Sequence, residues 1–174
     1  DREVDGFVAN FTIAENLVLN RSDQPPFARG PALNWPAITA NADERKQEFD
    51  IRAQSVTDPI SSLSGGNKQK VILARELSRP LAVLVASQPT RGVDVGAIEF
   101  LHKRIVEERD VGTAVLIVST ELEEVESLAD RIAVMYRGKI VGIVGPDTPR
   151  DVLGLMMAGI SYEDAVATVE ESHE

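Results

Sequence analysis

The sequence contains no cysteine and only two histidines, His102 and His173. Without cysteine there are no disulfide bonds and no thiolate metal sites, and two histidines are too few for a zinc cluster. No apolar run approaches the roughly 18 to 20 residues of a membrane-spanning helix, and residues 1–6 are charged where a signal peptide is apolar. We therefore expect a cytosolic protein that needs another subunit to reach a membrane.

Basic residues are also scarce. The chain has 18 lysines and arginines against 28 aspartates and glutamates, so its formal net charge is -10. A surface of this sign repels a phosphate backbone, and we predict that nucleic acid is not a partner. With 174 residues, of which 43% are hydrophobic, the chain can bury one sizeable core. One domain, or one domain with a small lobe, is expected.

Helical signals dominate the first part of the chain. Thr12 precedes apolar residues at helical spacing and has a glutamate three residues on, which is a capping-box start for a short helix within 12–20. The stretch 22–39 holds four of the nine prolines and predicts an irregular connection. Its Trp35 is expected to pack within a small helical lobe. Residues 40–53 predict a second helix.

The remainder alternates between apolar runs and amphipathic segments. A helix is expected to run from residue 68 to Pro80, because proline disfavours helical geometry in the residue before it. The other expected elements are buried strands at 81–86 and 113–119, helices at 95–110 and 121–129, and a hairpin at 131–145 around Arg137 and Gly138. This order is typical of a parallel α/β sheet with an antiparallel margin. The acidic residues 161–174 predict a frayed helix or a disordered tail.

Leu-Ser-Gly-Gly-Asn at 63–67 opens the helix that ends at Pro80. Gly65 and Gly66 leave the backbone open at a helix N-terminus, where unpaired amide N–H groups and the helix dipole favour an anion. Ser64 adds a hydroxyl and Asn67 an amide. Ser-Gly-Gly is also common turn chemistry, so the tripeptide alone does not decide between a phosphate site and a turn.

The surrounding segments add context to this motif. The motif at 63–67, the apolar strand 81–86, the segment Gly92–Asp94 and Thr120 resemble, in order and spacing, the signature, Walker B strand, D-loop and switch position of an ABC-transporter ATPase domain. Together with the motif, residues 88–97 are most similar to the C-terminal cassette of the double-cassette ATPases of simple-sugar and nucleoside importers. The resemblance covers about residues 1–160. Asp94 is equally suited to cap the helix that follows it.

The resemblance implies an α/β fold, a partial P-loop NTPase domain with a mainly parallel sheet and flanking helices. It also implies a small α-helical lobe and a C-terminal antiparallel hairpin. The ABC helical subdomain with the signature would span 1–80, the Walker B, D-loop and switch part of the ATPase core 81–160, and an acidic tail 161–174.

Several elements of the family pattern are missing or altered. No G-x-x-x-x-G-K-[ST] phosphate loop occurs, since Gly138-Lys139 is followed by isoleucine. The family carries that loop and the Q-loop glutamine ahead of a sequence like residues 1–6, so the resemblance implies a fragment of a longer protein. The family's Walker B Asp-Glu pair falls on Ser87 and Gln88, and Thr120 stands where a histidine contacts the γ-phosphate.

These substitutions predict lost chemistry. A serine at the metal position can bind a metal-bound water but brings no charge for Mg²⁺, and a glutamine can orient water but cannot accept a proton as a base. In the family each ATP lies between the phosphate loop and Walker B of one cassette and the signature of the other. We therefore expect the chain alone to be inactive and to bind ATP and Mg²⁺ only in the parent complex, with Ser64, Gly65, Gly66, Asn67 and Asp94 serving the partner cassette's ATP.

The partners implied are a second cassette and the membrane permease, which would hold the protein at the inner face of the cell membrane. Phe7, Val8, Phe11, Ile13 and Leu17 are candidates for the permease contact or for the core. The family's sheet has a further strand between 113–119 and 131–136, so we expect a gap there. A gap exposes strand edges and would favour self-association, rearrangement or marginal stability.

Two other interpretations of the sequence remain. In the first, the chain is a non-catalytic binding or regulatory module derived from an ABC ATPase. Ser87, Gln88 and Thr120 would then be positions at which catalytic residues have been lost. A soluble ABC ATPase of translation or DNA repair is disfavoured, because those proteins usually keep Asp-Glu at Walker B. The run Glu121, Glu123, Glu124 and Glu126 is expected to be a solvated helix face. Residues 87–100 are slightly more similar to nucleoside importers than to sugar importers.

Overall fold

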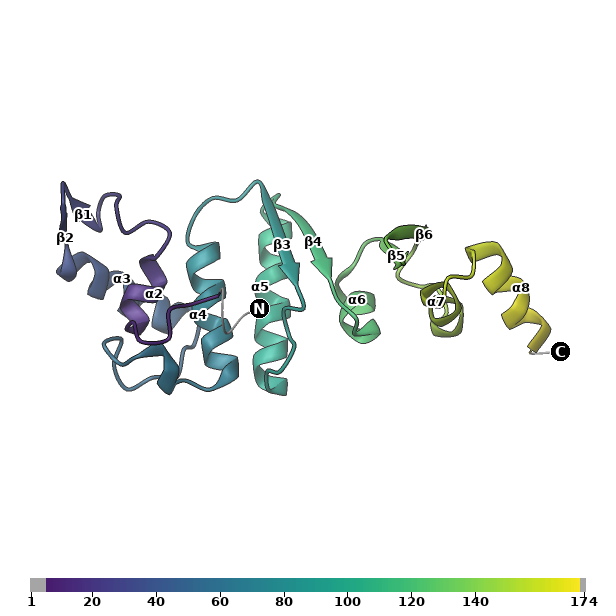
Figure 1. Cartoon of the computed structure of the whole chain (residues 1–174), viewed down its shortest axis with the longest axis horizontal. Coiled ribbons are helices and arrows are strands. Elements are labelled where there is room, and N and C mark those ends of the chain that lie inside the picture. The colour runs from purple at the N-terminus through teal and green to yellow at the C-terminus, as the bar shows by residue number, and fades with distance from the viewer. Residues whose placement is uncertain (1–5, 173–174) are drawn as a thin grey trace. The chain divides into compact units, whose positions relative to one another are not determined.

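The computed structural model of the protein describes residues 6–172, so that His173 lies outside the described part. The described residues form two compact units. The first contains the residues up to Leu84 together with Pro89–Val115, and the second contains Val85–Gln88 together with the residues from Leu116 onward. Figure 1 traces the chain from purple at the first residues to yellow at the last.

The first unit is a helical lobe followed by a longer helix. Its elements are α2 (Ile13–Val18), β1 (Ala28–Arg29), β2 (Ala32–Leu33), α3 (Trp35–Glu48), a 3-10 turn (Ile60–Ser62), α4 (Gly65–Leu77) and α5 (Val95–Asp110). Helix α2 packs against both α3 and α4, and α4 contacts α5 (Figure 1). One hydrophobic core joins them; its largest fully buried side chains are Ile13, Leu17, Ile38, Phe49, Ile60 and Val71.

The start of α2 confirms the predicted capping box. The Thr12 hydroxyl oxygen accepts from the Glu15 amide at 3.1 Å, and the Glu15 carboxylate accepts from the Thr12 amide at 2.7 Å. Behind it, the fully buried Asn16 side chain accepts from the Val8 amide at 2.9 Å. The same side chain donates to the carbonyls of Val8, Phe11 and Thr12. The amide therefore fixes the loop that leads into the helix.

The predicted connection over 22–39 is partly wrong. A two-residue hairpin, β1 with β2, interrupts it, and α3 begins at Trp35 rather than at residue 40. Pro36 lies in the first turn of α3, where the missing N–H has no intrahelical partner to lose. The helix ends at Glu48, before Asp50 adopts a left-handed φ of 47°. Trp35 is 50% exposed, so it packs into the helical lobe less completely than predicted.

Strands β3 (Val83–Ser87) and β4 (Ala114–Val118) form a two-stranded sheet. The Ala114 amide donates to the Ala82 carbonyl near one end and the Gln88 amide donates to the Val118 carbonyl at the other, so the strands run parallel.

The prediction that both strands are buried on two faces is wrong within the described residues. Leu84 is buried, but Val85 is 63% exposed and Leu116 56%. In a two-stranded sheet each strand has one neighbour, and the outer apolar face stays uncovered unless another element packs on it. Among the described residues β4 and β5 belong to separate sheets, as the expected gap requires.

The second unit is built on an antiparallel hairpin. It contains α6 (Leu122–Leu128), β5 (Ile132–Tyr136), β6 (Lys139–Val144), α7 (Arg150–Met157) and α8 (Tyr162–Ser172). The predicted turn is confirmed: Arg137 and Gly138 have φ of 47° and 78°, the left-handed pair that a two-residue hairpin turn requires. Helix α7 packs on β5, and its Leu153 and Met156 are fully buried.

Two acidic segments of this unit are partly buried instead of fully solvated. Residues 162–172 form helix α8, which packs on α7 through the fully buried Ala165. In α6, Glu124 is only 4% exposed, so the predicted solvated glutamate face is wrong at this position. Glu124 lies three residues before Ser127, whose hydroxyl donates to the Glu124 carbonyl.

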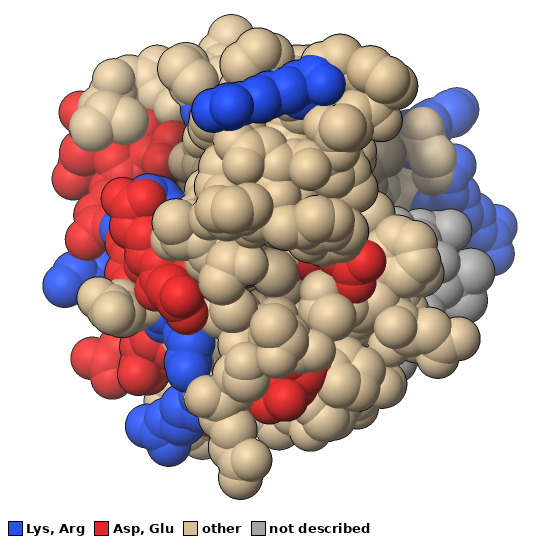
Figure 2. All heavy atoms as spheres, turned by 90° about the vertical axis from the view of Figure 1, so that its left-hand side faces the viewer, with Lys and Arg blue, Asp and Glu red and all other residues tan. Residues whose placement is uncertain are grey.

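The surface at the β1, β2 and α3 end of the first unit is shown in Figure 2. Acidic side chains gather along one margin of this face, while most of the remainder carries neither charge (Figure 2). Helix α3 carries three acidic residues, Asp43, Glu44 and Glu48. Within residues 6–172, none of the helices combines the length and the apolar character that crossing a membrane requires.

Candidate functional site: the first turn of α4 and the ends of β3 and β4

The predicted signature residues form the first turn of α4. Ser64 is the N-cap, and its hydroxyl oxygen accepts from the Asn67 amide at 3.4 Å and from the Asn67 side-chain nitrogen at 3.0 Å. The Asn67 side-chain oxygen accepts in turn from the Arg52 amide at 2.7 Å. Ser64 is exposed and its hydroxyl proton remains available, while the amides of Gly65 and Gly66 have no intrahelical acceptor. The turn therefore presents donors to an anion.

Asp94 ties this turn to the next helix of the unit. Its Oδ1 accepts from the Ala97 amide at 3.0 Å, which confirms the predicted cap of α5. A Cβ atom placed on Gly66 would lie 2.7 Å from Asp94 Oδ2 and 3.2 Å from Ala97 Cβ. An alanine at position 66 would therefore displace the Asp94 side chain or shift the start of α4, so glycine fits this close approach best. The structure brings the predicted signature and D-loop residues into contact.

The second unit contains the other three predicted site residues. Ser87 ends β3, and Gln88 follows it with a left-handed φ of 50°. The Gln88 amide donates to the Val118 carbonyl at 2.7 Å, and the Thr120 hydroxyl lies 3.5 Å from the Gln88 side-chain oxygen. Gln88 and Thr120 therefore face each other after the parallel strands. A left-handed non-glycine residue at a strand end is a strained position of the kind that functional sites often contain.

Neither Ser87 nor Gln88 brings a carboxylate to the strand end, and the described residues contain no cluster of three His, Cys, Asp or Glu that could hold a metal ion. The donor set at this end is neutral, so it does not fit direct coordination of Mg²⁺, which is usually bound through one or two carboxylates.

Comparison with known proteins places these features in a family. No family model matches the chain. The chain is 48% identical over 160 residues, 91% of its length, to the nucleoside import ATP-binding protein NupA of Lactococcus lactis. It is 43% identical over 95% of its length to the guanosine import ATP-binding protein NupO of Bacillus subtilis. It is 42% identical over 97% of its length to the glucose import ATP-binding protein TsgD13 of Haloferax volcanii. The chain belongs to the family of ABC-transporter ATP-binding proteins. It spans 31% to 32% of the length of these relatives.

The fold agrees with this family. Two dimeric structures of the ATP-binding cassette MJ0796, one of them in a post-hydrolysis state bound to ADP and Pi, match the chain with a TM-score of 0.66. They are 21% identical, and the match covers 82% of this chain and 60% of the cassette. The chain thus has a partial P-loop NTPase α/β fold.

Lys70 anchors α4 to the loop that precedes it in the lobe. The buried Lys70 ammonium donates to the Asp50 side chain and to the Asp50 carbonyl, both at 2.9 Å, and lies 4.7 Å from the centre of the Phe100 ring. The hydrogen bond from Lys70 and its charge lower the pKa of the Asp50 carboxyl below its ordinary value. No local pattern predicts this contact, since Lys70 is one polar residue of an amphipathic helix and Asp50 lies 20 positions away.

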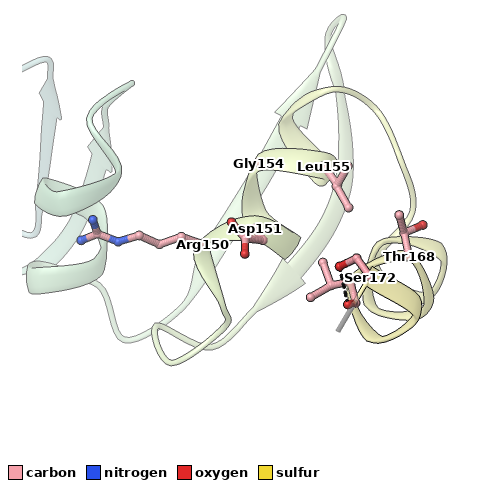
Figure 3. Close-up of a pocket in the computed structure, with 7 residues that line it drawn as sticks. Arg150, Asp151, Gly154, Leu155, Thr168 and Ser172 are labelled. Atoms are coloured by element: carbon pink, nitrogen blue, oxygen red, sulfur yellow. Dashed lines mark hydrogen bonds between the residues drawn. The ribbon is translucent and has the colours of Figure 1, made fainter. Parts of the chain in front are cut away.

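A groove in the second unit does not resemble a nucleotide site. It has a volume of about 400 Å³ and is lined by Arg150, Asp151, Gly154, Leu155, Thr168, Val169 and Ser172, from α7 and α8. In Figure 3 the Arg150 side chain extends away from Leu155 and Thr168. Its guanidinium instead makes an ion pair with Glu126 at 2.7 Å, which raises the Arg150 pKa. No basic side chain of the described residues therefore points into this groove.

Proposed function

We propose that this chain serves an ABC importer of nucleosides or simple sugars by supplying the signature turn that contacts the ATP of a second cassette. The first turn of α4 carries the proposal, because it combines an exposed hydroxyl, two glycine amides and the positive end of a 13-residue helix. The names of the similar relatives, which are nucleoside, guanosine and glucose import ATP-binding proteins, support the substrate classes.

The chemistry of this turn is electrostatic. The Ser64 hydroxyl and the first amides of α4 would donate to the γ-phosphate oxygens, where negative charge gathers as the phosphoryl group is transferred. The donors need no reorganisation, because Asn67 is held between Ser64 and the Arg52 amide and Gly66 is held against Asp94. Fixed dipoles of this kind stabilise the transition state more than water does.

The chain's own strand end is proposed to be poor at hydrolysis. The neutral side chain of Ser87 would meet Mg²⁺ only through water, and Gln88 would orient a water molecule without taking its proton. Thr120, 3.5 Å from Gln88, would hold the amide oxygen rather than act as an acid or base. ATP and Mg²⁺ would thus be used by the two-cassette complex, and we expect no tight binding to this chain by itself.

The membrane permease is the second proposed partner, and it would keep the protein at the inner face of the cell membrane. Of the five apolar candidates for that contact, Phe7, Ile13 and Leu17 are buried in the core of the helical lobe. Val8 and Phe11 are each about two-fifths exposed, at 40% and 43%, in the loop that Asn16 fixes. These two residues remain available to a partner, and self-association through the uncovered sheet faces stays a separate prediction.

The test has two parts. Calorimetry of the purified chain with ATP and Mg²⁺ should detect no saturable binding up to millimolar nucleotide. In the importer's complete two-cassette ATPase, Ser64→Ala should then lower kcat by about 10- to 100-fold, the effect of one lost hydrogen bond to a charged group, with KM nearly unchanged. The matched control is Ser61→Ala, since Ser61 is an exposed serine just outside the turn. An unchanged kcat in Ser64→Ala contradicts the proposal.

A non-catalytic binding module is the alternative that Ser87, Gln88 and Thr120 favour. Saturable ATP binding by the isolated chain, unaffected by Ser64→Ala, would support that alternative and reject the signature role.

A further inference from the structure

A second pocket of the first unit lies at the other end of α4 and gathers arginines. It has a volume of about 580 Å³ and is lined by Leu19, Asn20, Arg21, Gln24, Arg75, Glu76 and Arg79. These residues come from the end of α2 and the turn after it, and from the last part of α4 and the residues after it (Figure 1). The pocket is thus lined by three arginines and one carboxylate, that of Glu76, although the net charge of the chain is -10.

Arg21 is the least compensated of the three. Its Nη1 donates to the Ser78 carbonyl at 3.1 Å, and its guanidinium lies 5.1 Å from the centre of the Phe27 ring. Its Nε and Nη2 are buried and have no acceptor among the described residues. Burial, followed by the positive charges of Arg45 and Arg79, lowers the pKa of Arg21. A partly buried guanidinium with two buried, unpaired nitrogen atoms and no counter-charge among the described residues is unfavourable, so an anion in the pocket would stabilise it.

The other two arginines share a single acid. Arg75, with 10% of its side chain exposed, donates from Nε to Glu76 at 2.8 Å. Arg79, 53% exposed, lies 3.8 Å from the second oxygen of the same carboxylate. The side chains lining the pocket therefore carry two more positive than negative charges, and the Arg79 guanidinium is only loosely engaged.

We propose that this pocket binds a phosphate group. A phosphate dianion matches the excess of two positive charges and offers enough oxygens to accept from guanidinium groups on two different segments. A carboxylate carries one charge, and Glu76 already supplies one. The 580 Å³ volume exceeds that of a phosphate ion, so a group attached through one phosphate oxygen, such as the glycerol of phosphatidic acid, would fit while the phosphomonoester keeps its double charge.

This site is independent of the proposed nucleotide contact. Ser64 caps the N-terminus of α4, whereas Arg75 lies in its last turn, about 16 Å away along a helix of 1.5 Å rise per residue, and Arg79 follows the helix. Occupancy of this pocket can therefore be measured while the signature turn is intact.

The test is a titration of the chain with sodium phosphate at pH 8 and constant ionic strength, followed through the arginine Nε–H signals in ¹H–¹⁵N spectra. The signals of Arg21, Arg75 and Arg79 should shift and saturate together. Sodium acetate should bind at least about tenfold more weakly, as expected for one charge instead of two. Equal binding of acetate, or shifts that rise linearly and include the exposed Arg29, would overturn the proposal.

Variants locate the site. Arg79→Gln should raise the Kd for phosphate about tenfold, the loss of one charge-assisted hydrogen bond, whereas the control Arg29→Gln should change it less than about twofold. Arg79 is half exposed, so its replacement leaves the core intact even if Arg21→Gln unfolds the lobe. If the Arg79 and Arg29 variants change the Kd equally, phosphate binds through the general positive charge and not at this pocket, and the proposal is rejected.

Vesicles distinguish the source of the phosphate. Binding to phosphatidic acid vesicles at pH 8 but not to phosphatidylcholine vesicles, lost in Arg79→Gln and kept in Arg29→Gln, would identify a lipid phosphomonoester. A response to free phosphate without vesicle binding would identify a soluble phosphate. No response to either probe would reject the proposal.

Discussion

Replacing Gly66 by alanine tests the contact between the signature turn and α5. The added Cβ would lie 2.7 Å from Asp94 Oδ2 and 3.2 Å from Ala97 Cβ, where real Cβ atoms essentially do not come closer than about 3.0 Å. Either the backbone of α4 shifts or the Asp94 side chain turns away. Overpacking of this kind costs about 1–3 kcal/mol, and a lost aspartate cap costs about 1 kcal/mol.

A small gain opposes these terms. Alanine is about 1 kcal/mol better than glycine inside a helix, but position 66 lies in the first turn, where that preference is weakest. We therefore expect Gly66→Ala to lower the free energy of unfolding by about 1–2 kcal/mol, measured by urea denaturation. Gly154→Ala is the control, because Gly154 is helical, exposed and has nothing within 4 Å of its added Cβ, so this variant should not be destabilised.

A double-mutant cycle identifies the cause. Asp94→Ala removes the carboxylate that meets the new methyl group. If the clash is the cause, adding Gly66→Ala to Asp94→Ala should lower stability by much less than Gly66→Ala does alone. Equal destabilisation in both backgrounds, or a Gly66→Ala variant as stable as the parent, would refute the reasoning.

Two further predictions concern the residues that hold the helical lobe. The Lys70 contact lowers the pKa of Asp50 below its ordinary value of 3.8, so its contribution to stability is complete above about pH 4 and is lost as the pH falls through the lowered pKa. Urea midpoints between pH 6 and pH 2.5 should fall less in Asp50→Asn than in the parent, and the difference should be small because the Asp50 carboxylate is mostly exposed. Asn16→Leu should destabilise the chain by about 2–4 kcal/mol, because the Val8 amide and the carbonyls beside it lose buried partners, and thermal unfolding measures this. An Asn16→Leu variant with an unchanged midpoint would show that the loop before α2 finds other partners.

Local sequence signals predicted the helix ends and the hairpin well. The capping box at Thr12, the cap at Asp94 and the left-handed turn at Gly138 depend on residues within four positions of each other, so their chemistry is visible in the sequence. The start of α3 was missed because proline reads as a helix breaker, although the first helical turn tolerates it. Burial was harder to predict: Val85 sits in an apolar run, but its exposure depends on which elements cover the sheet.

In the candidate site, too, local features could be predicted from the sequence and long-range contacts could not. Ser64 and Asn67 could be placed at a helix start from the motif alone. The approach of Gly66 to Asp94 could not, because it joins residues far apart in sequence and is set by how α4 packs against α5. The arginines of the second pocket are likewise dispersed, and only the fold brings Arg21 beside Arg79.

The two oxygens of Asp94 have separate tasks, since Oδ1 caps α5 and Oδ2 rests against Gly66. This arrangement has an evolutionary consequence. A smaller residue at position 94 would make alanine at position 66 less costly, and serine there would still cap α5. The cost of a change at position 66 therefore depends on the residue at position 94, and we expect the two positions to change together.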